Sequence, residues 1–438
     1  MGTRETQQVT KTKLNRITGL SKQDPAREFG SLMHLFNSES LTSCFHQLDK
    51  DKAVGIDGID KASYGVNLEE NLQGLLKRMK DMAYRPGPVR EVRIPKEGKP
   101  EATRPLGISN LEDKIVQGVM KEVLESIYEP LFLECSYGFR PGRGCHDAIL
   151  ALQNHLHEAE IQTVIDIDLK DFFGSIDHQL LEELLRRKIK DTRFMRYIIR
   201  MFKAGVLSKG ELKVSEEGVP QGSICSPILA NIFAHHVIDV WIKEMVQPCC
   251  KGSVRLFRYA DDAVICCQLA SDAERIRVAL QKRLEKFKLQ LNEEKTKLVS
   301  FDKRLAAKGV EQGTFDFLGF TFYLGNSRRG KVVPKLRTRT KTMRAKLKRV
   351  GVWVKEIRNR LPMKEIWKIF VAKLRGHIQY YGVSHNLSWV ENFLDRSVRI
   401  VFKWLNRRSQ RKSFTWDEFN AFLRLNPLPR AIVVHPLF

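Results

Sequence analysis

The chain has 438 residues, which is enough for two or three domains. Its 75 Lys and Arg against 51 Asp and Glu give a net charge of +24, which is typical of a nucleic-acid-binding protein. No apolar run approaches the length of a bilayer span, so an integral membrane protein is excluded. The eight cysteines show no C-x-x-C spacing and suit no simple disulfide framework, and we expect a cytoplasmic protein with reduced thiols.

The N-terminal part of the chain begins with a polar, basic stretch. Residues 1–30 lack a clear period and predict a flexible arm. From residue 31 to 84 the pattern is helical, interrupted by a Gly-Asp turn in AVGIDGID. Two extended segments then follow in Tyr84–Ile108, with Lys96 and Arg104 at their loop-facing ends. Basic residues on such a hairpin are most often simply solvated.

A helix and an arginine-containing loop come next. Asp113–Ile127 has an apolar helical face and predicts a core helix. The loop that follows, SYGFRPGRGCHDAI, carries Arg140 and Arg143 around a Pro-Gly pair. Glycine lets a backbone approach a phosphate chain and arginine neutralises it, so we interpret this loop as a nucleic-acid contact. An ordinary turn with exposed arginines is the alternative.

Two acidic segments carry the chemistry. TVIDIDLKDFF (Thr163–Phe173) reads as a strand whose alternation places Asp166 and Asp168 on one face. RLFRYADDAVICCQ (Arg255–Gln268) reads as a hairpin with Asp261 and Asp262 at its turn, where a plain surface turn is the alternative. If the two strands are neighbours, three carboxylates converge and require a cation. Oxygen ligands favour magnesium, and two such ions would support nucleotidyl transfer.

The segments around these strands predict supporting elements. A helix over His178–Ile189 is expected, with Asp177 as its cap. In GVPQGSICSPILANIF, a Pro-Gln-Gly turn precedes a helix, and small residues leave room for a base pair. Ala273–Leu289 predicts an amphipathic helix, and Leu291–Ser300 leads back into extended structure.

The C-terminal part is helical and strongly basic. Met343 to Leu361 repeats apolar residues at 4-3 spacing, a second helix follows Pro362, and a third is expected to start at the capping box Ser388-x-x-Glu391. Between residues 331 and 412 there are 23 Lys or Arg against four Asp or Glu, so this window carries +19 of the net charge. Basic and aromatic residues interleave here, as backbone neutralisation and base stacking require. The candidate nucleic-acid-binding residues are Arg375, Tyr380, Tyr381, Lys403, Trp404, Arg407, Arg408 and Arg411.

Several motifs, taken together, resemble those of one family. The YADD turn (Tyr259–Asp262) and IDLKDFFGSIDH resemble the carboxylate motifs of reverse transcriptases. SYGFRPGRGCHDAI, GVPQGSICSPILANIF, LNEEKTK and FLGFTF, in this order, resemble those of group II intron-encoded reverse transcriptases, also called maturases. The chain departs from the family pattern at Ser223, where a second glycine is usual, and this could alter the grip on the nascent base pair.

The resemblance implies an α+β fold: a right-hand polymerase with an antiparallel palm sheet, mixed fingers and an all-α thumb. The implied domains are fingers and palm over 31–328, with an N-terminal extension to about residue 84, a thumb over 329–385 and a DNA- and RNA-binding segment over 386–438. The implied activity is an RNA-directed DNA polymerase in which Asp168, Asp261 and Asp262 hold two Mg²⁺ ions.

The resemblance also implies roles for single residues. Lys96, Arg104 and Gln221 would bind the incoming nucleotide, and Phe173 would exclude a ribose 2′-hydroxyl. Lys295, favoured over Lys297, would protonate the leaving pyrophosphate. The implied template and primer contacts are Arg140, Arg143, Gly222, Tyr259, Leu318 and Gly319.

The expected partners are a structured RNA, a DNA primer or target and dNTPs, with no membrane, for a monomer or homodimer. The family implies binding to an intron RNA and assistance to its splicing and retrohoming. The sequence ends at Phe438 without the Cys/His cluster of an endonuclease, so a nick or a replication fork is expected to prime synthesis. Two alternatives stay open: an RNA-binding splicing cofactor, and a domesticated enzyme that copies a dedicated noncoding RNA, for instance in antiphage defence.

Overall fold

The computed structural model describes residues 3–96, 99–208, 211–219, 222–408 and 413–437. It contains two compact units, and both helices and strands contribute to an α+β fold, as predicted. Unit 1 comprises Met1–Pro95, Thr103–Ala148 and Ile165–Leu298. Unit 2 comprises Lys96–Ala102, Ile149–Val164 and Val299–Phe438.

The elements up to residue 300 alternate between helices and short strands. The α-helices are α1 (Thr3–Gln23), α2 (Ser38–Gln47), α3 (Lys61–Val66), α4 (Leu68–Lys80), α5 (Leu111–Tyr128), α6 (Cys145–Glu158), α7 (His178–Arg186), α8 (Thr192–Lys203), α9 (Ser226–Ala234) and α10 (Ala270–Lys286). The strands are β1 (Val89–Lys96), β2 (Lys99–Ile108), β3 (Thr163–Ile167), β4 (Val206–Ser208), β5 (Glu211–Lys213), β6 (Val254–Tyr259), β7 (Asp262–Cys267) and β8 (Lys297–Ser300). Two π-helical turns, His235–Asp239 and Ile242–Val246, follow α9.

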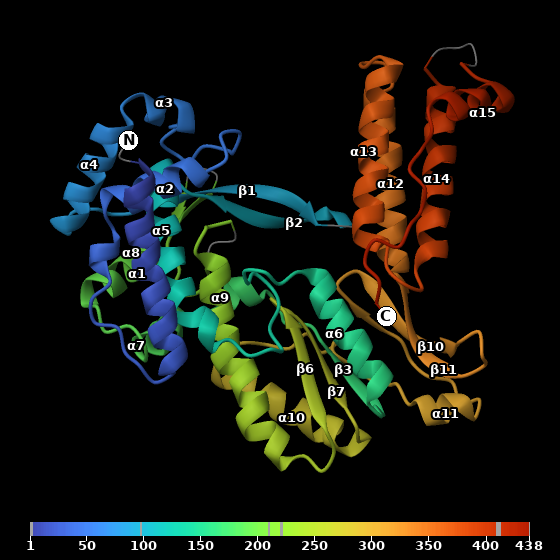
Figure 1. The fold of residues 1–438 in the computed structure, drawn as a ribbon, viewed down its shortest axis with the longest axis horizontal. Coiled ribbons are helices and arrows are strands. Elements are labelled where there is room, and N and C mark those ends of the chain that lie inside the picture. The colour runs from blue at the N-terminus through green and yellow to red at the C-terminus, as the bar shows by residue number, and fades with distance from the viewer. Residues whose placement is uncertain (1–2, 97–98, 209–210, 220–221, 409–412, 438) are drawn as a thin grey trace. The chain divides into compact units, whose positions relative to one another are not determined.

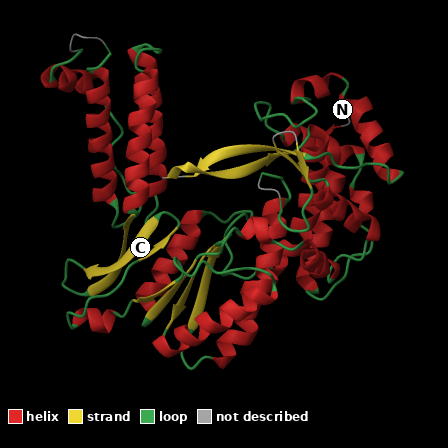
Figure 2. Cartoon of the chain, turned by 180° about the vertical axis from the view of Figure 1, so that it is seen from behind, coloured by secondary structure: helices red, strands yellow, loops and turns green. Residues whose placement is uncertain are grey.

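Two four-stranded sheets organise this part of the chain. One has the strand order β6-β7-β3-β8, and α10 packs against it beside β7 (Figure 1), with Ala273, Ile276 and Leu280 buried in the core. The other has the order β2-β1-β4-β5, in which β1 and β2 form a long paired ribbon (Figure 2). β3, β6 and β7 are almost wholly buried and consist mainly of apolar residues, although β6 also contains the buried Arg258.

The prediction of a flexible N-terminal arm is wrong, because α1 is a helix that contacts the core of unit 1. Ile17 is buried, and the Ser21 hydroxyl donates a hydrogen bond to the Ile127 carbonyl on α5. The apolar residues of α1 are too sparse to give a visible period, but they suffice to hold one face against α5. The predicted core helix is α5 itself, and Asp177 caps α7 as expected by accepting from Leu180 N–H.

Unit 2 combines a three-stranded sheet with a helical bundle. Its elements after residue 300 are α11 (Lys303–Ala307), β9 (Phe315–Phe317), β10 (Phe320–Asn326), β11 (Val332–Thr338), α12 (Thr340–Ile357), α13 (Met363–Tyr381), α14 (Leu387–Leu405) and α15 (Trp416–Leu425). The helices α12, α13 and α14 lie side by side (Figure 1). Their contact is apolar: Met343, Leu347, Val350 and Val354 of the predicted stripe are buried.

One helix start in unit 2 differs from the prediction. The prediction that a capping box at Ser388 starts the third helix is wrong, because α14 begins at Leu387 and its N-cap residue is Asn386. The Asn386 side chain makes no capping hydrogen bond and instead contacts Thr338 and the Tyr381 carbonyl. A capping box forms at α15, between Thr415 and Glu418.

All eight cysteines lie among the described residues, and none of them forms a disulfide there. Among the helices described, none combines the length and the apolar character needed to cross a membrane.

Candidate active site

Two adjacent aspartates lie at the tip of the hairpin formed by β6 and β7. The strands are antiparallel, and Tyr259 pairs with Asp262, which leaves a connection of only Ala260 and Asp261. Ala260 has a φ of +58°, as tight two-residue hairpins require. The predicted acidic hairpin is therefore confirmed.

Asp168 reaches the same sheet edge from a neighbouring strand. It follows the last residue of β3, which lies next to β7 in the sheet, so the condition for converging carboxylates is met. Its backbone is fixed by the LNEEKTK segment: the Asp168 carbonyl accepts from Asn292 N–H at 2.8 Å, and its N–H donates to Thr296 Oγ1 at 3.3 Å. This segment thus places the carboxylate of Asp168.

The electrostatics of Asp261 reflect this convergence. The side chain reaches solvent, but the surrounding protein partly desolvates it, and the negative charge of Asp168 adds to this, so the pKa of Asp261 is raised. The positive charges of Arg104 and Arg258 act in the opposite direction and lower that pKa. The carboxylates of Asp168 and Asp261 therefore repel each other, and a bound cation would relieve the repulsion.

The metal site expected from the sequence is not preformed. Across the described residues, no three Asp, Glu, His or Cys side chains already surround a point where a metal ion could sit. Instead, Lys295 Nζ lies 3.0 Å from Asp168 Oδ1. The side chains of Asp168, Asp261 and Asp262 are nevertheless suited to a hard divalent cation, because they offer carboxylate oxygens at the ends of two neighbouring strands. A metal ion could therefore replace the Lys295 ammonium group as the partner of Asp168.

Aromatic rings line the side of the acidic turn. Phe173 is half-buried, and its ring meets that of Phe139 edge-on at 6.2 Å between centroids. Phe139 in turn contacts Tyr259, at 6.5 Å. Phe139 is 47% exposed and has a φ of +57°, an uncommon conformation for an aromatic residue. Sequence reasoning missed Phe139, because it concentrated on the arginines and glycines of the same loop.

The residues proposed to bind the nucleotide are only partly described. Arg104 is exposed on β2, close enough to influence Asp261. Lys96 ends β1, but its side chain lies outside the described part, as does Gln221 altogether. Gly222 has a φ of +104°, and a Cβ there would lie 2.6 Å from the Gly107 carbonyl oxygen of β2. Glycine is thus required at this position by backbone packing alone.

Ser223, the departure from the family pattern, points into the core of unit 1. It is buried, and its hydroxyl donates to Gln117 Oε1 on α5 at 2.9 Å. The same Gln117 oxygen accepts from Ile224 N–H. The serine therefore anchors this turn to α5.

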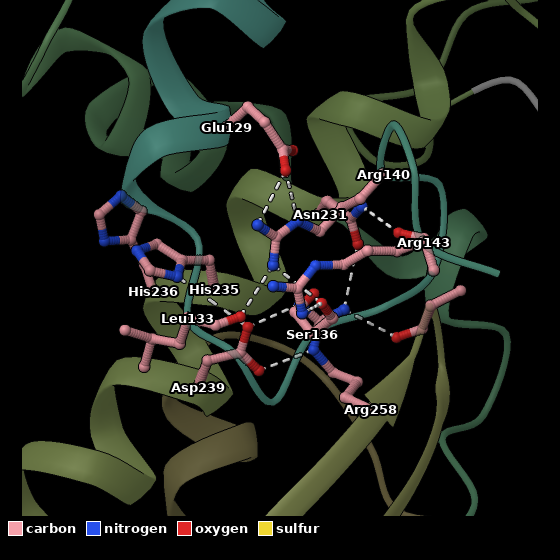
Figure 3. Close-up of polar contacts among 12 residues, drawn as sticks. Glu129, Leu133, Ser136, Arg140, Arg143, Asn231, His235, His236, Asp239 and Arg258 are labelled. Atoms are coloured by element: carbon pink, nitrogen blue, oxygen red, sulfur yellow. Dashed lines mark hydrogen bonds and ion pairs between the residues drawn. The ribbon is translucent and has the colours of Figure 1, made fainter. Parts of the chain in front are cut away.

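The two arginines of the SYGFRPGRG loop form hydrogen bonds and ion pairs with other groups of the protein. Arg140 was expected to contact the template, but it is buried and donates to Glu129 and to the carbonyls of Leu133 and Ser136 (Figure 3). Arg143 pairs with Glu134 at 2.5 Å. The Arg140 guanidinium supports its own loop, because a loop without regular structure needs donors for its carbonyl groups, and the expected template contact of Arg140 stays a prediction.

In unit 2, the predicted primer contacts Leu318 and Gly319 form the turn between β9 and β10, both with positive φ. The hydroxyl of Tyr380 donates to the Leu318 carbonyl at 2.9 Å. Tyr381 is buried, with its hydroxyl close to Gly319. The expectation that Tyr381 stacks on a base is wrong, because its ring packs against Phe320 and under Lys346.

Cations surround Trp404 near the C-terminal end of α14. Arg358 lies 5.0 Å from the ring centroid, Arg407 5.4 Å and Lys355 5.7 Å. Arg408 donates to the Leu361 carbonyl and so also serves the fold. Lys403, Arg375 and Arg407 are exposed, whereas Arg411 lies outside the described residues.

The structure thus combines an α+β fold with aspartates at the ends of two neighbouring strands, an arrangement compatible with a metal-dependent nucleotidyltransferase. Comparison with known families agrees: residues 94–322 match the model described as reverse transcriptase (RNA-dependent DNA polymerase). The chain belongs to the reverse transcriptase family, and it is similar to members of this family that are encoded by group II introns. Domains of this family generally use divalent metal ions.

Two similar proteins come from bacteria. The group II intron-encoded protein LtrA of Lactococcus lactis subsp. cremoris is 34% identical over 234 residues, covering 53% of this chain and 38% of LtrA. Protein YkfC of Escherichia coli (strain K12) is 35% identical over 311 residues, covering 64% of this chain and 78% of YkfC. Nuclear intron maturase 4 of Arabidopsis thaliana mitochondria is 28% identical over 130 residues, or 27% of this chain and 15% of that protein. The chain thus spans under two fifths of the length of LtrA.

Proposed function

We propose that the protein is an RNA-directed DNA polymerase that adds dNTPs to the 3′-hydroxyl of a primer on an RNA template. Its membership in the reverse transcriptase family supports this proposal. The observation that carries it is the placement of carboxylates from two distant segments: Asp168 directly follows β3, and Asp261 lies in the turn before β7, the strand next to β3. In this proposal unit 1 holds most of the fingers and palm of a right-hand polymerase, and the helices of unit 2 form the thumb.

Asp168, Asp261 and Asp262 would hold two Mg²⁺ ions. When bound, such ions activate the attacking hydroxyl and neutralise charge on the leaving pyrophosphate. Arg104 and Lys96 would bind the triphosphate, the first through its planar fork and the second as a point charge. Lys295 would then donate a proton to the pyrophosphate oxygen.

Primer extension tests the polymerase. The assay uses an RNA template, an annealed DNA primer, Mg²⁺ and dNTPs, with the Asp261→Asn variant beside the unmodified protein. We expect extension that falls at least about 10³-fold in the variant, because charge stabilisation in the transition state is lost. Asp302→Asn is the control, because Asp302 caps α11, a helix of unit 2 that carries none of the proposed metal ligands. Equal activity of Asp261→Asn and the unmodified protein would contradict the proposal.

A second role, binding of a structured intron RNA that assists its splicing, is supported by the basic helices of unit 2. Lys403 and Arg407 are exposed on or next to α14, in the window that carries most of the net charge. The relatives named as intron-encoded protein and maturase also favour this role.

The two roles can be separated by paired variants. Lys403→Gln with Arg407→Gln should weaken RNA binding and reduce the slope of log affinity against log salt by about one for each phosphate that is no longer neutralised. Arg277→Gln with Lys282→Gln, which removes two exposed cations from α10, is the control. Asp261→Asn should leave RNA binding and splicing intact. Equal RNA affinity of both double variants would argue against this surface.

A further inference from the structure

Arg258 is a fully buried cation directly before the acidic turn. It lies on β6, two residues ahead of Ala260, and only 1% of its surface is exposed. A buried guanidinium is tolerated only when its donors find partners. The fold must therefore place several hydrogen-bond acceptors around the Arg258 guanidinium.

Every nitrogen of the Arg258 guanidinium donates to an acceptor within the protein (Figure 3). Nε and Nη2 donate to the two carboxylate oxygens of Asp239 at 2.7 and 2.6 Å. Nη2 also donates to Ser136 Oγ at 2.7 Å. Nη1 donates to Asn231 Oδ1 at 3.1 Å and to the Ala260 carbonyl at 3.0 Å. One of these hydrogen bonds thus ends on the backbone of the acidic turn itself.

The partners of Arg258 come from elements that are separate in sequence. Asn231 lies on α9, and Asp239 ends the π-helical turn that follows it. Ser136 belongs to the loop whose backbone pairs with β6, where Tyr137 N–H donates to the Arg258 carbonyl. Wide π-helical turns recur at functional sites because they redirect a side chain out of the normal helical register. Here the redirected side chain is the counter-ion of Arg258.

The turn is also held from its other side. Gly138 lies against Ala260 so closely that a Cβ there would come within 2.4 Å of the Ala260 nitrogen. The Asn231 amide donates to the Gly138 carbonyl at 2.6 Å, so Asn231 connects both contacts. Ala260 has a left-handed conformation and is contacted on both sides: its carbonyl accepts from the Arg258 guanidinium, and its nitrogen lies against the Gly138 backbone.

We propose that Arg258, oriented by Asp239, is a positioning residue: it fixes the Ala260–Asp261 backbone and so places the Asp261 carboxylate where a divalent ion can bind. This inference rests on the proposed polymerase function. Arg258 touches neither substrate nor metal and acts through the turn. His235 does not compete for Asp239 as a cation, because burial and the charges of Arg258 and Arg140 lower its pKa to about 4.

Arg258→Lys tests the proposal, because lysine keeps the charge but cannot reproduce the five-donor fork. Asn231→Ala and Gly138→Ala disturb the same turn without removing the buried charge. Asp191→Asn is a control for stability alone, because Asp191 is buried in unit 1 and accepts from the N–H groups of Leu32, Met33, Arg193 and Phe194. Gly144→Ala is the glycine control, because a Cβ there makes only an ordinary contact with Asp147.

Mn²⁺ binding is measured for each variant by calorimetry in the absence of nucleotides, and the Mg²⁺ concentration for half-maximal extension and the KM for RNA–DNA duplex are measured by primer extension. Thermal unfolding of each variant gives its stability. We expect the affinities for Mn²⁺ and Mg²⁺ to weaken about 10- to 100-fold in Arg258→Lys, Asn231→Ala and Gly138→Ala, as for residues that orient metal ligands. The KM for RNA–DNA duplex should stay unchanged, and excess metal should partly restore the rate. The two control variants should keep the affinity of the unmodified protein.

The outcomes separate this inference from the proposed function. If the three variants lose thermal stability like Asp191→Asn but bind Mn²⁺ normally, Arg258 only stabilises the fold and the inference is wrong. If Arg258→Lys does not fold, Asn231→Ala and Gly138→Ala decide by the same criterion. If the unmodified protein binds Mn²⁺ but does not extend a primer, the polymerase proposal fails, whereas a loss of Mn²⁺ binding in the variants would still support positioning by Arg258.

Discussion

The ammonium group of Lys295 lies 3.0 Å from Oδ1 and 3.1 Å from Oδ2 of Asp168. This ion pair joins the proposed general acid to a proposed metal ligand. Because the Lys295 side chain is 62% exposed, the pair is weak and can open when a metal ion takes the carboxylate. Lys295 would then be released toward the phosphates of the incoming nucleotide.

Lys295→Met should therefore slow single-turnover dNTP incorporation by about 10²-fold, the usual contribution of a general acid. The metal requirement should not rise, because Asp168 loses a competing cation. Lys297→Met is the matched control, since Lys297 is exposed on β8 in the same segment. Quench-flow kinetics measures the rate. Equal losses in both variants would indicate a general effect of positive charge and contradict a specific role of Lys295.

Phe173→Val should raise ribonucleotide use relative to dNTPs by about 10- to 100-fold, because the smaller side chain leaves room for a 2′-hydroxyl. The ratio of kcat/KM for NTP and dNTP is the measurement. Phe139→Leu is the companion variant, because the Phe139 ring packs edge-on against Phe173. A small change in Phe139→Leu would mean that Phe173 excludes the hydroxyl by its own volume. No change in Phe173→Val would leave Phe173 as a core residue only.

Asp113 predicts a pH dependence of stability in unit 1. Burial raises its pKa to about 6 from an ordinary 3.8, although Tyr84 and Gly87 N–H donate to it. A carboxyl group with a raised pKa stabilises the fold in its protonated form, so this contribution is present below about pH 4 and is lost as the pH rises to about 6. Asp113→Asn should remove up to about 3 kcal/mol of this pH dependence.

The measurement is denaturant unfolding at several pH values between 4 and 7. Asp81→Asn is the control, because Asp81 is exposed in unit 1. A pH profile that is identical in Asp113→Asn and the unmodified protein would show that the group titrates normally.

The contrast between Arg258 and Asp261 explains how far the sequence could predict the site. Asp261 stands in an acidic pair between two apolar runs, so local pattern alone indicated its hairpin. Arg258 looked like one more basic residue, because its partners Asp239 and Ser136 are distant in sequence. The hydrogen bonds that Arg140 makes within its loop were not predicted for the same reason: a positive charge is visible in a sequence, but its partners are decided by tertiary packing. The buried stripe of α12, which depends only on helical period, was predicted correctly at Met343 and Leu347.

Gly222→Ala should destabilise unit 1 and impair polymerisation together. With a φ of +104°, Gly222 holds a conformation that costs other residues about 1–3 kcal/mol, and the added Cβ would collide with the Gly107 carbonyl of β2. Urea unfolding and primer extension are measured on the same preparation. Gly58→Ala is the control, because Gly58 shares the positive φ, at +70°, but has no atom within 4 Å of a Cβ. If Gly222→Ala and Gly58→Ala lose similar stability, the backbone strain of a positive φ alone explains the loss at Gly222. A larger loss in Gly222→Ala, with a higher KM for dNTP, would show that the close approach of this turn to β2 shapes the nucleotide site.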